Sequence, residues 1–214
     1  MTARHYNPLD QLVIGVDQAV RTLFGRPQVT ERPNPAHGVS DVELSDAERD
    51  HVARLMRINH TGEVCAQGLY QGQALTARDD EVRTSMQRSS DEENDHLDWC
   101  EARVRELGGR LSLLNPLWYT GSFLLGAAAG VTGDRWSLGF VAETEKQVEG
   151  HLDEHLAQIP EHDQRTRAIL EQMKADEIHH GETALAQGGV NLPAPIRLAM
   201  KLTSKVMTKS VYYV

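Results

Sequence analysis

Two short stretches decide the fold of this 214-residue chain: Glu-Glu-Asn-Asp-His-Leu at residues 92–97 and Asp-Glu-Ile-His-His-Gly at residues 176–181. Each contains a Glu-x-x-His pair, which on an α-helix places a carboxylate and an imidazole on one face, about 4.5 Å apart along the axis. Both side chains of such a pair can bind one metal ion. The two pairs are Glu93 with His96 and Glu177 with His180.

A lone glutamate precedes each pair at a similar distance. Glu63 lies 30 residues before Glu93, and Glu145 lies 32 residues before Glu177. Two antiparallel helices joined by a short turn return the chain to the same height after such a distance. Four carboxylates and two imidazoles are then expected to converge, as in a carboxylate-bridged di-iron or di-manganese centre inside a four-helix bundle. The predicted metal ligands are Glu63, Glu93, His96, Glu145, Glu177 and His180.

A third Glu-x-x-His pair, Glu48 with His51, is assigned to a different role. Ser45 precedes Glu48 by three residues at the start of a long periodic stretch, which is the pattern of a helix capping box. His51 is also about 18 Å along the helix from Glu63, the next carboxylate. This pair is therefore predicted not to bind metal.

The environment of the predicted ligands leaves some alternatives open. Glu143 and Glu149 lie on the same expected helix as Glu145, and spacing does not decide among the three; Glu145 makes the two halves of the pattern most alike. Around Glu63, a merely structural helix would place apolar residues where this chain has polar ones. These polar residues are expected to surround the ligands, with exposure to solvent as the alternative: Asn59, His60, Gln67 and Tyr70.

The composition favours helices, because aromatic residues make up only 5% of the chain and the long segments are rich in Leu, Ala, Glu, Gln and Arg. With 40% hydrophobic residues, the chain is neither disordered nor a multi-span membrane protein. The predicted class is all-α, a four-helix bundle with an additional apolar connector helix. Helices are expected at about 8–25, 46–77, 80–107, 116–130, 135–159 and 161–187, with a last one from 195. The expected segments are 1–44 (N-terminal helix and proline-rich linker), 45–190 (bundle) and 191–214 (basic amphipathic C-terminal helix).

Two segments are predicted to meet a membrane surface. The uncharged stretch 111–133 contains Asn-Pro and four glycines, which makes a poor transmembrane span. It is either a surface-embedded helix that admits an apolar substrate or a buried connector. In the tail, basic residues recur every four positions among apolar ones, as in an amphipathic helix on an anionic membrane; a packed helix with a solvated basic side is the alternative. The basic residues are Arg197, Lys201, Lys205 and Lys209.

Charge and cysteine content restrict partners and compartment. The formal net charge of −9 argues against nucleic acid as a partner. The two cysteines, Cys65 and Cys100, form no Cys-x-x-Cys pair and are expected to be buried packing residues. The N-terminal sequence lacks the apolar core of a signal peptide, so a reducing cytoplasm is expected.

With these residues assembled, the chain resembles the bacterial demethoxyubiquinone hydroxylase family, the di-iron enzymes of ubiquinone biosynthesis. The resemblance is carried by RINHTGEVCAQGLYQGQ (57–73), EENDHL (92–97), NPLW (115–118), VAETE (141–145) and DEIHHG (176–181). It implies a ferritin-like bundle holding two Fe²⁺ ions. By this likeness Glu63 and His96 would be terminal ligands of one iron, Glu145 and His180 of the other, and Glu93 and Glu177 would bridge. His151 matches a family position, but Leu152 stands where some relatives have Tyr.

The resemblance also implies an activity. The chain would be a monooxygenase that uses O2 to hydroxylate the ring of 2-polyprenyl-3-methyl-6-methoxy-1,4-benzoquinol, with NADH as the reductant, although the chain has no Gly-x-Gly-x-x-Gly motif. It would lie peripherally on the cytoplasmic face of the bacterial cell membrane, as a homo-oligomer or within a ubiquinone-biosynthesis complex. The alternative is a ferritin-like iron-storage or peroxide-scavenging protein; the apolar connector argues against the former and the absence of Cys-x-x-Cys against the latter.

Overall fold

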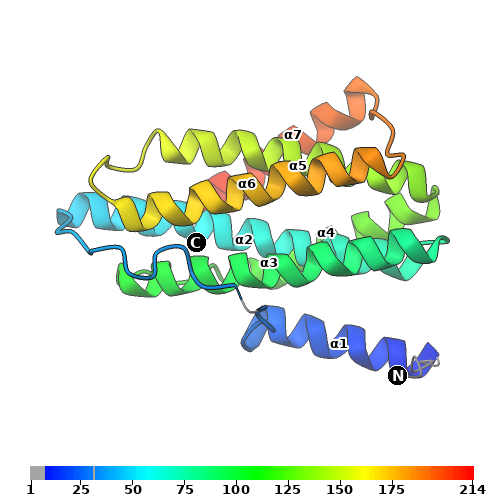
Figure 1. Cartoon of the computed structure of the whole chain (residues 1–214), viewed down its shortest axis with the longest axis horizontal. Coiled ribbons are helices and arrows are strands. Elements are labelled where there is room, and N and C mark those ends of the chain that lie inside the picture. Colours follow the sequence, from blue (N-terminus) through cyan, green and yellow to red (C-terminus); the bar gives the residue numbers. More distant parts are fainter. Residues whose placement is uncertain (1–7, 31) are drawn as a thin grey trace.

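The computed structural model describes residues 8–30 and 32–214, and in this part of the chain every regular element is a helix (Figure 1). The all-α prediction is confirmed, and the predicted helices agree with the observed ones to within a few residues. The helices are α1 (Pro8–Phe24), α2 (Asp46–Thr76), α3 (Asp80–Glu106), α4 (Asn115–Val131), α5 (Asp134–Leu156), α6 (Gln164–Ala186) and α7 (Ala194–Tyr213).

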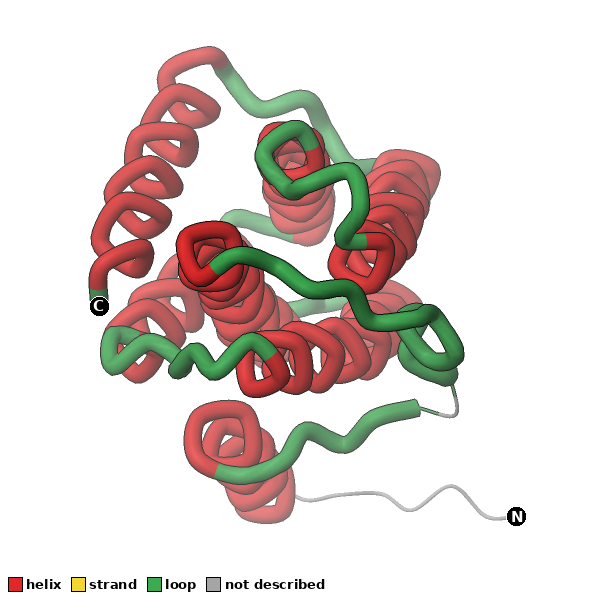
Figure 2. Tube along the Cα trace, turned by 90° about the vertical axis from the view of Figure 1, so that its left-hand side faces the viewer, coloured by secondary structure: helices red, strands yellow, loops and turns green. Residues whose placement is uncertain are grey.

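Four of these helices form a ferritin-like bundle. Helix α2 packs against α3, and α5 packs against α6; seen end-on, the two pairs lie side by side (Figure 2). The connector α4 links the pairs and lies along α2, while α7 covers part of α2 and α5. Residues on the inner faces of α2, α3, α5 and α6 therefore project toward a common centre.

Local sequence signals fix the helix ends. At the start of α2, the Ser45 hydroxyl accepts from the Glu48 backbone N–H and the Glu48 carboxylate accepts from the Ser45 backbone N–H, so the predicted capping box is present. The start of α6 differs from the expected residue 161. Asp163 accepts from the Thr166 N–H and caps the helix, so α6 begins at Gln164 after a turn.

The connector α4 is in part buried and in part exposed. Gly126 lies against the backbone of Leu69 in α2, which allows the two helices to approach closely. On the other side of α4, Leu117 and Leu124 are 66% and 63% exposed. The helix is therefore neither a fully buried connector nor exposed on all sides. None of the helices among the described residues is long and apolar enough to cross a membrane.

Helix α7 is attached to the bundle by few buried residues. Val211 is buried, whereas Leu198, Leu202 and Val206 are 58%, 55% and 61% exposed. Three apolar residues of the predicted amphipathic tail thus face solvent, whereas Met200 and Met207 are half-buried. As for the cysteines, Cys100 is buried as expected and Cys65 is half-buried.

Candidate metal centre

The six residues predicted as metal ligands are all buried near the middle of the bundle, with exposed fractions between 0% and 4%. Helix α2 supplies the first glutamate, α3 and α6 each supply a Glu-x-x-His pair, and α5 supplies the other lone glutamate. The helical spacing therefore places both members of each pair on the inner face, as the sequence predicts. The six are Glu63, Glu93, His96, Glu145, Glu177 and His180.

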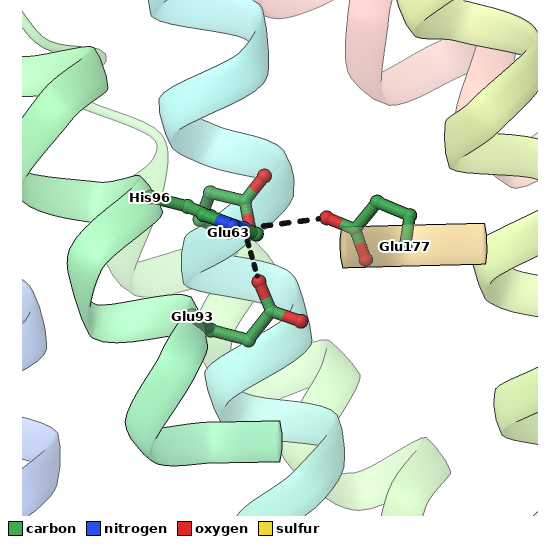
Figure 3. A group of neighbouring side chains, drawn as sticks. All are labelled: Glu63, Glu93, His96 and Glu177. Atoms are coloured by element: carbon green, nitrogen blue, oxygen red, sulfur yellow. Dashed lines mark hydrogen bonds and ion pairs between the residues drawn. The ribbon is translucent and has the colours of Figure 1, made fainter. Parts of the chain in front are cut away.

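Four of these side chains form a tight group around the ring of His96 (Figure 3). The His96 Nδ1 atom lies 2.8 Å from Glu93 Oε2, 3.4 Å from Glu177 Oε1 and 3.7 Å from Glu63 Oε2. One ligand atom of each of the four residues lies within 4.8 Å of those of the others. This buried cluster of three carboxylates and one imidazole can hold a metal ion.

His180 lies on the other side of the same two glutamates. Its Nδ1 atom is 3.1 Å from Glu93 Oε1 and 3.5 Å from Glu177 Oε2. Each of these two glutamates thus has one oxygen near His96 and the other near His180. Helix α5 completes the group with Glu145, whose Oε1 atom accepts a 2.6 Å hydrogen bond from the Tyr70 hydroxyl.

Unsatisfied atoms at the centre test whether these residues fit a metal. Among the described residues, Glu93 Oε1, Glu177 Oε2 and His180 Nδ1 are buried without a hydrogen-bond partner. The three atoms face one another, because both oxygens lie within 3.5 Å of the His180 nitrogen. Buried polar atoms are costly unless they are paired or coordinate a metal. The donor set and its convergence therefore fit a cation at this position.

The pKa shifts of the clustered carboxyls also favour a bound cation. Burial, together with the charge of Glu93, holds the pKa of Glu63 well above its usual range, and burial with the charges of Glu177 and Glu93 does the same for the pKa of Glu145. Burial opposes the charge on Glu93, but the positive charge of His96, the hydrogen bond with His96 and the nearby His180 ring outweigh it and lower the pKa of Glu93. Without metal, the raised pKa values of Glu63 and Glu145 favour the neutral forms of these two carboxyls, which reduces the buried negative charge. Divalent cations would take over that role.

Comparison with known proteins agrees with this arrangement. The family model described as "Ubiquinone biosynthesis protein COQ7" matches residues 50–211. The chain belongs to the COQ7 family. It is 59% identical over 209 residues to a 3-demethoxyubiquinol 3-hydroxylase of Ectopseudomonas mendocina, covering 98% of this chain and 97% of the relative. It is 58% identical over 209 residues to the protein of that name from Pseudomonas paraeruginosa, with the same coverage, and 56% identical over 204 residues to that from Aromatoleum aromaticum, covering 95% and 98%.

Two outer carboxylates hold the histidines of this COQ7-family centre, and sequence reasoning missed both. The Nε2 atom of His96 lies 2.9 Å from Asp176 Oδ2, and that of His180 lies 2.8 Å from Glu92 Oε2. With Nε2 bonded to a carboxylate, each ring turns Nδ1 toward the centre. The signal was present, because each of these acids immediately precedes the glutamate of a Glu-x-x-His pair. Each acid acts on the histidine of the opposite pair.

The polar residues predicted to surround the COQ7-family centre are all buried, but they differ in what they contact. Tyr70 bonds to Glu145, a predicted ligand. Gln67 instead donates to the Ser90 carbonyl at 2.5 Å, while the other two contact residues away from the ligands. Asn59 pairs with His155, and His60 lies near Asn115.

His51 and Glu143, which are not among the six predicted ligands, bond to residues outside the centre. His51 Nδ1 lies 2.9 Å from the Tyr212 hydroxyl, away from the centre. Glu143 accepts a 2.7 Å hydrogen bond from Gln147 one turn further along α5 and is not fully buried, whereas Glu145 is 2% exposed. Of the three glutamates that spacing left open, Glu145 is therefore the buried one, whereas Glu143 and Glu149 are half-buried.

Proposed function

We propose that this chain is a 3-demethoxyubiquinol 3-hydroxylase: a di-iron monooxygenase that hydroxylates the ring of the polyprenylated benzoquinol in ubiquinone biosynthesis. The observation that carries the metal part of the proposal is the placement of Glu93 and Glu177, each with one oxygen toward His96 and the other toward His180. Such glutamates can bridge two ions. The shared name of three relatives, 56–59% identical over nearly the whole chain, supports the reaction and its substrate.

In this proposal residues 45–190 are the metal-binding unit. Glu63 and His96 would hold one Fe²⁺, Glu145 and His180 would hold the other, and Glu93 and Glu177 would be shared by both. A donor set rich in carboxylate favours iron or manganese over zinc, and use of O2 favours iron. When bound, the two irons supply O2 activation with electrons from a reductant, for which we propose NADH.

The chain's own residues orient this centre. The Tyr70 hydroxyl donates to Glu145 and fixes that carboxylate. Burial, with the nearby charge of Glu145, raises the pKa of Tyr70 well above its usual range, so the hydroxyl keeps the proton that it donates. The outer acids Asp176 and Glu92 hold the two imidazoles in the orientation needed for binding.

Metal content tests the centre. Anaerobic titration with Fe²⁺ is expected to saturate near two ions per chain, and replacing Glu93 or Glu177 by Ala is expected to abolish both. The matched control is Glu48→Ala, which removes a glutamate three residues before a histidine but far from the centre. Saturation near one ion in the unchanged chain would contradict the paired site. Mass analysis of the quinol after incubation with iron-loaded protein, O2 and NADH tests the reaction.

We further propose that the protein binds the cytoplasmic face of the membrane peripherally, because its substrate carries an apolar tail. Two exposed surfaces support this: the leucines of α4 and the mixed apolar and basic surface of α7, where Lys201, Lys205 and Lys209 lie beside exposed Leu198 and Leu202. Apolar insertion is nearly independent of salt, whereas each lysine near an anionic surface is worth about 1 kcal/mol and is screened by salt.

These two forces are separable by substitution. Replacing the three α7 lysines by Gln is expected to weaken binding to vesicles rich in anionic lipid at low salt only. Replacing Leu117 and Leu124 by Ser is expected to weaken binding at every salt concentration. If both variants bind anionic and neutral vesicles as the unchanged chain does, the proposed membrane surface is wrong.

The iron-storage and peroxide-scavenging alternative is not favoured. The ligand set alone would serve such a protein equally well, because function does not follow from fold. The relatives, however, carry a hydroxylase name, and α4 and α7 expose apolar side chains rather than a uniformly polar surface. Rapid oxidation of many more than two Fe²⁺ per chain, with mineral formation, would reverse this choice.

A further inference from the structure

The linker between α1 and α2 runs along the bundle (Figure 1), and Asp95 of α3 binds two of its residues, Thr30 and Arg32. Asp95, which is fully buried, accepts hydrogen bonds at 2.6 Å from both the backbone N–H and the hydroxyl of Thr30. It also accepts a 2.8 Å bond from Arg32 Nε. The guanidinium of Arg32 stacks over Trp99, with its central carbon 5.2 Å from the ring centroid.

Arg32 does more than fasten the linker, because its other end reaches α6. Its Nη1 atom donates to Asp176 Oδ2 at 2.7 Å, across 144 residues of chain. The same Oδ2 atom lies 2.9 Å from His96 Nε2. The remaining oxygen of Asp176 accepts from Gln172 at 2.9 Å. One carboxylate oxygen thus joins an arginine of the linker to a histidine of the metal centre.

The second histidine lacks this support. His180 Nε2 pairs with Glu92, whose side chain is 40% exposed. That pair lies at a cleft of about 530 Å³ between α3 and α6, lined also by Ser89 and Thr183. The outer carboxylate of His96 is held by a guanidinium and is 14% exposed, whereas that of His180 opens to solvent. The outer carboxylates of the two halves therefore differ in burial and in their partners, although the ligands of the two halves are alike.

We propose that Arg32 is a positioning residue for one half of the metal centre: it holds Asp176, and through Asp176 it fixes the ring of His96 with Nδ1 toward the ligands. A planar guanidinium suits this task because it can bond Asp95 and Asp176 at once in a fixed geometry. The effect of Arg32 on metal binding rests on the proposed metal centre. The orientation of His96 can be measured without metal.

The competing explanation is that Arg32 only attaches the linker. Thr30→Val is the matched control, because it removes the 2.6 Å bond from the Thr30 hydroxyl to Asp95 and the 3.2 Å bond that this hydroxyl accepts from the Arg32 backbone, but it leaves the side-chain bond from Arg32 to Asp176 in place. Arg32→Met keeps a long unbranched side chain against Trp99 and removes both charge-assisted bonds. Arg32→Lys keeps the charge but cannot span both carboxylates, so it serves if the Met variant does not fold.

The first readout is the rate at which the imidazole Nε2–H proton of His96 exchanges with water in the metal-free full-length chain. This rate is measured by NMR with ¹⁵N-labelled histidine. In the unchanged chain and in Thr30→Val, a slowly exchanging Nε2–H signal is expected, assigned by its absence in His96→Asn. In Arg32→Met, and in the same direction in Arg32→Lys, this proton is expected to exchange faster. Equal exchange rates in a folded Arg32 variant and the unchanged chain would overturn the proposal.

The second readout is Fe²⁺ affinity, with near-infrared circular dichroism of the ferrous protein. Loss of an outer partner typically weakens metal binding about 10- to 100-fold. We expect Arg32→Met to lower the affinity for one of the two Fe²⁺ ions about 10-fold and to change the circular dichroism bands of that ion. Combination with Asp176→Asn should add nothing to the loss from Asp176→Asn alone, while combination with Glu92→Gln should be additive. Additivity with Asp176→Asn would overturn the proposal. Failure of the unchanged chain to bind two Fe²⁺ would refute the proposed function, while the NMR comparison would still decide the role of Arg32.

Discussion

Replacing Gly126 by Ala should destabilise the protein by disturbing the contact between α4 and α2. A Cβ atom built at this position would lie 2.2 Å from the Leu69 carbonyl oxygen and 3.0 Å from its Cα atom. Both are backbone atoms of α2, so no side chain can rotate away and the two helices must separate. Overpacking of this kind typically costs about 1–3 kcal/mol. It outweighs the gain of about 1 kcal/mol that alanine brings to a helix interior.

Gly121 on the same helix provides the control. It is exposed, and a Cβ atom there would meet nothing within 4 Å. Gly121→Ala should therefore stabilise the protein by about 0.5–1 kcal/mol through helix propensity and the restricted unfolded chain. Urea unfolding of both variants at equal metal content, followed by far-ultraviolet circular dichroism, measures the difference. If Gly126→Ala is as stable as Gly121→Ala, the close approach of α4 to α2 does not exist as described.

Three further predictions concern the centre and its surroundings. Glu145→Gln should lose Fe²⁺ while Glu143→Gln retains it, as measured by metal content per chain; equal losses would show that α5 presents a different face. Loading with Fe²⁺ at pH 7 should release protons, because the metal-free centre holds them on two imidazoles and two carboxyls, all with raised pKa values; calorimetry in buffers of different ionisation enthalpy measures this release, and heats independent of buffer would contradict it. Burial lowers the pKa of His60 and of His155 from 6.5 to about 4, so each ring makes the unfolded chain bind more protons between these values; between about pH 6.5 and pH 4, stability to urea should fall by about 3 kcal/mol more in the unchanged chain than in His60→Gln or in His155→Gln, and equal pH profiles of variant and unchanged chain would show that these rings are not buried as neutral groups.

The sequence by itself determined the helices and the candidate ligand set. Helix ends depend on signals within a few residues, such as Ser45 with Glu48, so they can be read along the chain. The inner face of each helix follows from a period of 3.6 residues, which places Glu93 and His96 together without any knowledge of the neighbouring helices. The similar spacing of the two halves then indicated that both pairs lie at one height.

Tertiary structure alone decided which groups meet across helices. The distinction between Glu143 and Glu145 required the rotation of α5 about its axis, which spacing along the chain does not contain. The link from Arg32 to Asp176 joins residues 144 positions apart, and it depends on the path of a linker that has no periodicity. Gln67 and Asn59 are buried, but they bond to Ser90 and His155 on other helices and not to the ligands that they were expected to surround. Such contacts require distances between packed side chains that are correct to within a few tenths of an ångström. These distances are fixed only when the helices have docked.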